Sequence, residues 1–204
     1  MYLLDQRMLG TAILFLLGSL VVVKQIATGS ILDKPMGGLK VRLVNIFNLL
    51  FLLAVNPLAA ILLITRRLAT ADPTHMTLDE RWILTVLEFA GLVMYVTGFL
   101  LMAGALITLG HNYQPGGSDP RSGDTMVSHG PYKLIRHPMY TAALSISLGL
   151  ACLIESWAFF CVFCTYLVLI SMLIPVEEDG LRKAYSEPYV AYRQKAKKLI
   201  PFVY

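Results

Sequence analysis

Charged residues are scarce in this chain: they make up 15% of its 204 residues, while 56% are hydrophobic. So apolar a composition excludes an ordinary soluble domain, and the length allows four to six membrane-spanning helices. The formal net charge is only +4, and the sequence lacks a basic run with interleaved aromatic residues, which argues against a nucleic-acid partner. The composition therefore predicts an all-α integral membrane protein surrounded by membrane lipids.

Cysteine is also rare, and its three positions all lie within apolar runs: Cys152, Cys161 and Cys164. An odd number of buried cysteines does not describe a disulfide framework. Cys161 and Cys164 have CxxC spacing, but no second pair of ligands is near them in the sequence. We therefore interpret all three as small packing residues.

Several familiar catalytic motifs are missing as well. The sequence contains no P-loop, no GxGxxG and no nucleophile elbow. His111, His129 and His137 share one hydrophilic segment, but they lack HxxxH or HxH spacing and alternate with turn residues. We expect no metal site in this protein.

Long apolar runs are what the chain has in abundance. Five of them are candidate membrane helices: residues 9–23, 41–64, 82–109, 138–154 and 157–175. We expect the first to be a retained helix, because no small-residue cleavage site follows it. Pro57 should kink the second, whose asparagines Asn45, Asn48 and Asn56 should bond across to other helices. The very short break before the fifth run predicts a helical hairpin.

The chain reads as a single membrane domain, 1–204, with three spans in residues 1–109 and most of its polar sequence in residues 110–204. Residues 110–137 form the longest hydrophilic segment, which is typical of a loop that is either functional or disordered. After Pro175, tyrosines and basic residues share a helical pattern, which predicts an interfacial helix split by Pro188. Glu88 lies within the third run. It is a functional candidate, or else a group near the surface or paired with a neighbouring helix.

The basic residues indicate the orientation. Of the 17 lysines and arginines, thirteen fall in the first loop, the third loop and the C-terminal segment, and four fall on the other side. The positive-inside rule then places the N-terminus outside and the third loop and C-terminal segment in the cytoplasm. The two most polar parts of the chain therefore share the side that soluble cofactors reach.

One of these parts is the stretch 130–140, with the sequence GPYKLIRHPMY. Pro138 suits the first position of a helix, and the backbone N–H groups exposed there attract an anion. Arg136 and His137 add hydrogen-bond donors beside it, while Tyr132 and Tyr140 offer aromatic faces. This stretch suits a ligand that combines a carboxylate with a cation or an aromatic base.

The other polar part is the pair Glu177 and Glu178, at the end of the fifth run. A carboxylate there can accept hydrogen bonds from hydroxyl or ammonium groups. Together the two parts suit S-adenosylmethionine, which has a carboxylate, a cation, hydroxyls and an aromatic base. In the alternative interpretation, Arg136 and His137 contact lipid headgroups and the glutamates cap an amphipathic tail.

These residues resemble the isoprenylcysteine carboxyl methyltransferase family, which is related to the membrane phospholipid methyltransferases. The resemblance is carried by Gly130-Pro131-Tyr132, Arg136-His137-Pro138-Met139-Tyr140, the hairpin, the Glu177-Glu178 pair, and the later Tyr189 and Tyr192. It covers about half the chain, from residue 110 to the end. It implies a small multi-helix membrane enzyme that uses S-adenosylmethionine and releases S-adenosylhomocysteine.

The resemblance also implies a set of site residues in the loop, the fourth helix and the C-terminal segment. The implied cofactor residues are Gln114, Asp124, Thr125, Met126, Val127, Tyr132, His137, Pro138, Met139, Tyr140 and Glu177. Methyl transfer from the sulfonium would be in-line, to a lipophilic acceptor that enters from the bilayer. Arg136 or Glu178 would orient or deprotonate that acceptor.

One position departs from the family. Members that methylate prenylcysteine carry an arginine four residues before the first glutamate of the pair, and here that position is Leu173. A prenylcysteine carboxylate therefore loses its expected partner. A phospholipid amine or a small thiol fits as well. A non-enzymatic transporter or assembly factor that keeps the fold is the competing interpretation, although a transporter should show internal repeats and polar residues at mid-membrane depth.

Overall fold

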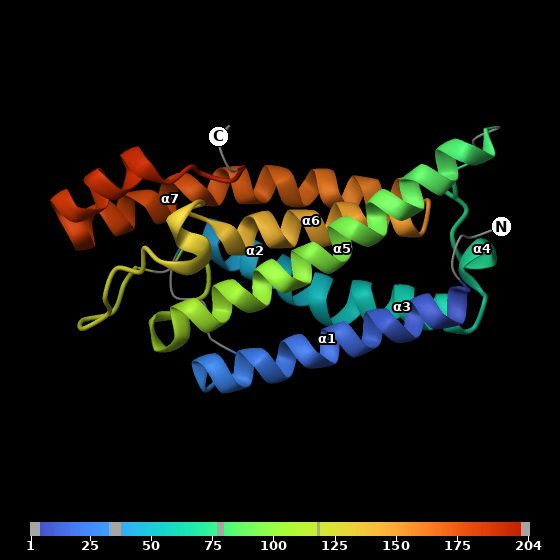
Figure 1. Ribbon diagram of the computed structural model, residues 1–204, viewed down its shortest axis with the longest axis horizontal. Coiled ribbons are helices and arrows are strands. Elements are labelled where there is room, and N and C mark those ends of the chain that lie inside the picture. The colour runs from blue at the N-terminus through green and yellow to red at the C-terminus, as the bar shows by residue number, and fades with distance from the viewer. Residues whose placement is uncertain (1–4, 33–37, 77–79, 118, 201–204) are drawn as a thin grey trace.

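The computed structural model describes residues 5–32, 38–76, 80–117 and 119–200. Within these ranges the chain is helical and contains no strands, which confirms the all-α prediction (Figure 1). Four segments are long and apolar enough to cross a membrane: Gln6–Thr28, Leu39–Ile64, Trp82–Asn112 and Trp157–Lys195. The fourth predicted run forms a shorter apolar helix, Pro138–Leu153.

The N-terminal helices form two of these segments. Helix α1, Gln6–Thr28, begins at Asp5, whose carboxylate accepts hydrogen bonds from two backbone N–H groups, and ends at Gly29 in the left-handed conformation. The second segment is built from α2 (Leu39–Leu50), a π-helical turn η1 (Phe51–Val55) and α3 (Asn56–Ile64). Helix α1 packs along α3 and α5.

The π-helical turn η1 lies directly before Pro57, where the sequence predicts a kink. Pro57 has no N–H to donate to the preceding turn, so a carbonyl there needs another partner. The Asn56 side chain donates to the Phe51 carbonyl at 2.9 Å and accepts from the Tyr95 hydroxyl at 2.9 Å. The Phe51 carbonyl also accepts from the Asn56 backbone N–H, so this side chain reinforces the π-helical turn and ties the helix to α5.

Helices α5 and α6 form the closest pair in the bundle. After the short helix α4 (Leu68–Ala71), α5 runs over Arg81–Leu109, and α6 spans Pro138–Leu153. A Cβ atom added to Gly91 would lie 2.8 Å from the Gly149 carbonyl, and one added to Gly149 would lie 2.6 Å from the Tyr95 nitrogen. Small residues therefore allow the two backbones to touch. Two 3₁₀ turns, η2 (Gly110–Asn112) and η3 (Gly130–Lys133), lie in the loop between these helices.

Helix α7, Trp157–Lys195, corrects one prediction. The sequence analysis ended the fifth helix at Pro175, but α7 continues through it. The cost of the one backbone hydrogen bond lost at Pro175 is smaller than the stability of the helical turns on both sides of it. The chain turns sharply at Ser186 (φ 48°), two residues before Pro188, so the predicted split is present. Pro188 then falls in the first turn of the returning helix, where a missing N–H costs little.

Figure 1 shows which loops share an end of the bundle. The connection after α1, the loop between α5 and α6, and the far end of α7 gather at one end. The N-terminus, α4 and the α6–α7 turn lie at the other. The loops that share an end of the bundle are thus the same ones that the distribution of lysines and arginines assigns to one side of the membrane.

A buried acidic pair occupies the end opposite to the loop 110–137. Glu88 on α5 and Glu155 in the α6–α7 turn are 6% and 5% exposed, and their carboxyl groups share a hydrogen bond. The His75 Nε2 atom lies 3.4 Å from a Glu155 oxygen. Burial, together with the charge of Glu88, raises the pKa of Glu155 to about 7. Of the two interpretations of Glu88, this contact favours pairing with a neighbour.

Replacement of Glu155 by Gln should change the pH dependence of stability. Because folding raises the pKa of Glu155, its stabilising contribution is present below about pH 4.5 and is lost as pH rises through about 7. Glutamine imitates the protonated carboxyl, so the variant should unfold a few degrees above the unmodified protein at pH 8 and at the same temperature at pH 4.5. Thermal unfolding in detergent measures this. The exposed Glu187→Gln should change neither value, and a Glu155→Gln protein no more stable at pH 8 would contradict the assignment.

Candidate functional site

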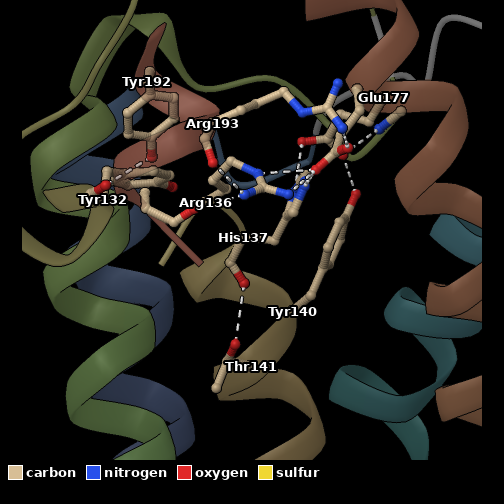
Figure 2. A network of polar contacts seen from close by, with 11 residues as sticks. Tyr132, Arg136, His137, Tyr140, Thr141, Glu177, Tyr192 and Arg193 are labelled. Atoms are coloured by element: carbon tan, nitrogen blue, oxygen red, sulfur yellow. Dashed lines mark hydrogen bonds and ion pairs between the residues drawn. The ribbon is translucent and has the colours of Figure 1, made fainter. Parts of the chain in front are cut away.

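The two polar parts of the sequence meet where α6 begins beside α7. His137 precedes the first residue of α6, and its ring lies between Glu177 and Glu178 of α7. The Nδ1 atom is 3.5 Å from a Glu177 oxygen, and the Nε2 atom is 3.3 Å from a Glu178 oxygen. Residues forty positions apart therefore form one polar cluster (Figure 2).

His137 is 3% exposed, yet it faces two carboxylates. Burial by itself lowers the pKa of His137, but the hydrogen bonds and charges of Glu177 and Glu178 outweigh burial and hold that pKa above its usual value. The protonated ring can donate from both nitrogens, one to each glutamate. His137 thus binds α6 to α7 and sets the position of both carboxylates.

Glu177 is the less enclosed carboxylate of the pair, with 22% of its side chain exposed against 11% for Glu178. One of its oxygens accepts hydrogen bonds from the Tyr140 hydroxyl and from the Gly117 backbone N–H, the latter at 3.1 Å. Tyr140 also stacks on the His137 ring, with centroids 5.5 Å apart. Glu177 is thereby held at a fixed position with its other oxygen toward His137.

Arg136 connects Glu178 of α7 to the C-terminal segment of the chain. Its Nε and Nη2 atoms lie 3.0 Å and 2.9 Å from one Glu178 oxygen, and its Nη1 donates to the Ala196 carbonyl at 2.6 Å. Its backbone N–H donates to the Lys197 carbonyl at 2.7 Å. The Tyr192 hydroxyl donates to the Tyr132 carbonyl at 2.6 Å, a second tie to the returning helix (Figure 2).

The loop 110–137 has its own polar anchor at Asp124. Gln114 donates to the Asp124 carboxylate at 2.5 Å, and the Arg121 backbone N–H donates at 2.9 Å. Burial raises the pKa of Asp124, but these hydrogen bonds and the charge of Arg121 outweigh it, so the pKa lies below its usual value. Beside this anchor, Asn112 and Thr125 exchange two hydrogen bonds. The anchor holds residues 124–127 over the bundle.

One cavity of about 480 Å³ connects these groups. All eleven predicted cofactor residues line it: Gln114, Asp124, Thr125, Met126, Val127, Tyr132, His137, Pro138, Met139, Tyr140 and Glu177. Arg136 lines it too. Glu178 does not belong to the lining, because it lies behind His137 and Arg136. Within the described ranges no group of three or more metal-ligating side chains occurs.

The cavity continues from this polar end into the membrane bundle. We call this continuation the apolar arm and define it by residues of α2, η1, α5, α6 and α7: Asn45, Asn48, Phe51, Phe99, Ile146 and Tyr166. Phe99 lies ten residues before the end of α5 and Ile146 eight residues after Pro138, so the arm reaches about 12–15 Å into the bundle.

None of the six residues that define the apolar arm was predicted as a site residue, and three of them are polar: Asn45, Asn48 and Tyr166. Asn45 and Asn48 were expected only to bond across to other helices. Asn48 does so, since it accepts from the Tyr166 hydroxyl of α7, whereas Asn45 donates to the Gly116 carbonyl of the loop 110–137 at 3.0 Å. Their i, i+3 spacing places both amides on one face of α2, and this was the available signal. Tyr166 gave no such signal, because its partner is 118 residues away.

Leu173 is fully buried and occupies the position where the resembling family has an arginine. A Cβ atom added to Gly117 would lie 2.5 Å from a Leu173 methyl group and 3.0 Å from Val41. Gly117 also has φ +77°, which favours glycine. Leu173 therefore lies outside the cavity lining and packs against Gly117, in the loop that donates to Glu177.

Comparisons with known proteins agree with this architecture. Residues 86–188 match the phospholipid methyltransferase family. A probable protein-S-isoprenylcysteine O-methyltransferase of Oryza sativa subsp. japonica is 28% identical over 141 residues, 62% of this chain and 65% of the relative. The protein-S-isoprenylcysteine O-methyltransferase of Xenopus laevis is 30% identical over 132 residues, 59% of this chain and 42% of the relative. The match thus covers less than two thirds of either relative.

A solved structure shares the fold. The eukaryotic intramembrane Ras methyltransferase, an isoprenylcysteine carboxyl methyltransferase, superposes with a TM-score of 0.53 at 19% identity, over 80% of this chain and 74% of that chain. These matches confirm the resemblance that the RHPMY stretch and the Glu177-Glu178 pair carry.

Proposed function

This chain belongs to the phospholipid methyltransferase family, and from that premise we propose that it transfers a methyl group from S-adenosylmethionine to a lipophilic acceptor in the membrane. The observation that carries the proposal is the single cavity. Its polar end holds a carboxylate, an imidazole and several tyrosines, and its other end lies among apolar helices. A site that joins a water-soluble cofactor to an acceptor within the bilayer needs both ends.

The residues of the polar end fit S-adenosylmethionine. Glu177 presents a carboxylate that His137 holds in place, the start of α6 offers a helix N-terminus for the methionyl carboxylate, and Tyr132 offers an aromatic wall. When bound, the cofactor supplies an electrophilic methyl group. The acceptor's lone pair forms the new bond while the carbon–sulfur bond breaks, its electron pair stays on sulfur, and S-adenosylhomocysteine is released. The protein positions both reactants and excludes water.

The buried Leu173 supports an acceptor other than a prenylcysteine carboxylate, because this position supplies no cation to pair with an anion. A phospholipid amine or a thiol remains compatible with the cavity. We also propose that the loop 110–137 and the C-terminal segment face the cytoplasm and the N-terminus lies outside, as the distribution of basic residues predicts.

Calorimetric titration of the detergent-purified protein tests the cofactor. Saturable binding of both S-adenosylmethionine and S-adenosylhomocysteine is expected, followed by transfer of a radiolabelled methyl group into a lipid extract. Absence of binding in a folded sample would contradict the enzyme proposal and favour a transporter or assembly factor that keeps the fold.

A further inference from the structure

We propose that Asn45 and Asn48 bind the head of the methyl acceptor, and that this head is an uncharged hydroxyl or thiol group. The inference rests on the proposed methyltransferase function and adds to it the class of acceptor and the residues that select it. It is derived from the polar groups that the apolar arm contains.

The two asparagines lie deep in the membrane segment. They are six and nine residues after Leu39, the first residue of α2, which places them about 9 Å and 14 Å along the helix. Both asparagines therefore lie inside the candidate membrane span Leu39–Ile64. A primary amide is costly at that depth unless all its hydrogen-bonding atoms find partners.

Within the part of the chain that the structure describes, one side of each amide makes no hydrogen bond to protein. The Asn45 nitrogen donates to the carbonyls of Val41 and Gly116, and the Asn48 oxygen accepts from the Tyr166 hydroxyl. Among the described residues no further hydrogen bond is made by the Asn45 oxygen or by the Asn48 nitrogen. Both residues line the cavity. One acceptor and one donor are therefore left on the same face of α2 for a ligand.

An uncharged X–H group matches this pair. Its proton can be donated to the Asn45 oxygen, and its heteroatom can accept from the Asn48 nitrogen. The contact between Asn45 and Gly116 places this subsite beside Gly117, whose N–H binds Glu177. The head would thus lie at the junction between the apolar arm and the polar end, where methyl transfer requires it.

An anionic head is disfavoured by the same surroundings. None of the residues that define the apolar arm carries a charge. The cations of the cavity wall are committed elsewhere: Arg136 to Glu178 and the C-terminal carbonyls, His137 to Glu177 and Glu178, and Lys24 to the carbonyls of Ser30 and Ile31, each at 2.9 Å. A carboxylate in the arm would lie in hydrocarbon without a counter-ion.

The transfer balances for an uncharged acceptor. The oxygen or sulfur lone pair forms a bond to the methyl carbon, the sulfonium–carbon bond breaks with its electron pair remaining on sulfur, and the acceptor's proton leaves to water at the polar end. The products are a methyl ether or thioether, S-adenosylhomocysteine and a proton.

Methyl transfer to probes of matched chain length tests the proposal. In vesicles containing the unmodified protein, 1-dodecanethiol or 4-dodecylphenol should be methylated at least tenfold faster than dodecanoate. Faster methylation of dodecanoate would overturn the inference, as would no methylation of either uncharged probe by protein that binds S-adenosylmethionine. Failure to bind S-adenosylmethionine would instead overturn the proposed function.

An Asn48→Leu variant tests the subsite. It should raise KM for the better uncharged probe about tenfold, leave kcat within twofold and leave S-adenosylmethionine affinity unchanged. Tyr166→Phe removes only the hydroxyl group that donates to the Asn48 oxygen, so KM should rise less than threefold. Thr97 lies outside the cavity lining, and Thr97→Val should leave KM unchanged. An unchanged KM in Asn48→Leu, or equal effects of the Asn48 and Tyr166 variants, would overturn the assignment.

Discussion

Replacement of Glu177 by Gln should weaken S-adenosylmethionine binding about 30- to 100-fold. The carboxylate accepts from the Tyr140 hydroxyl and the Gly117 N–H through one oxygen and faces His137 with the other. Glutamine keeps the shape but removes the charge and turns two acceptor positions into N–H donors. Hydrogen bonds to a charged group contribute about 1.5–3 kcal/mol, which corresponds to this loss. Calorimetric titration with the cofactor measures the change.

Asp179→Asn is the matched control for Glu177→Gln. It makes the same change of charge two residues later on α7, where the carboxylate is 59% exposed and pairs with Lys183. Its S-adenosylmethionine affinity should equal that of the unmodified protein. Equal affinities for Glu177→Gln and Asp179→Asn would remove Glu177 from the cofactor site.

Replacement of Arg136 by Met should lower the free energy of unfolding by about 3 kcal/mol. The Arg136 and Glu178 side chains are 9% and 11% exposed, and removing one member of a buried pair typically costs 3–5 kcal/mol. The lower end applies, because His137 and Arg193 still lie 3.3 Å and 3.6 Å from Glu178. The variant also loses the hydrogen bond to the Ala196 carbonyl, so the returning helix should detach first. Denaturant unfolding and protection from hydrogen exchange at residues 187–199 measure both effects.

A double variant separates the two roles that Arg136 could have. Arg136→Met with Glu178→Met removes both charges and should recover most of the lost stability, whereas the exposed Lys133→Met should cost little. The sequence predicts that Arg136 or Glu178 orients or deprotonates the acceptor. If Arg136→Met lost turnover at unchanged stability, that catalytic role would be supported over the structural one.

The sequence by itself determined most of the helices and the composition of the polar end. Helix boundaries follow from local signals, such as Asp5 and Gly29 around α1 and Pro138 at the start of α6, and apolar length determines which segments can span a bilayer. The stretch 130–140 and the Glu177-Glu178 pair stand out because polar residues are rare here. Their roles in binding and catalysis remain predictions.

The tertiary structure decided how these pieces act together. Pro175 was expected to end a helix, but α7 passes through it, and the turn comes at Ser186. The cavity, the pairing of Asn48 with Tyr166, and the enclosure of Glu178 behind Arg136 all join residues far apart in the chain. The hydrophobic pattern of one helix predicts which of its residues contact lipid or water. It does not predict which side chain of a distant helix forms a hydrogen bond with them. That partner determines whether an amide only joins two helices or is also available to a ligand.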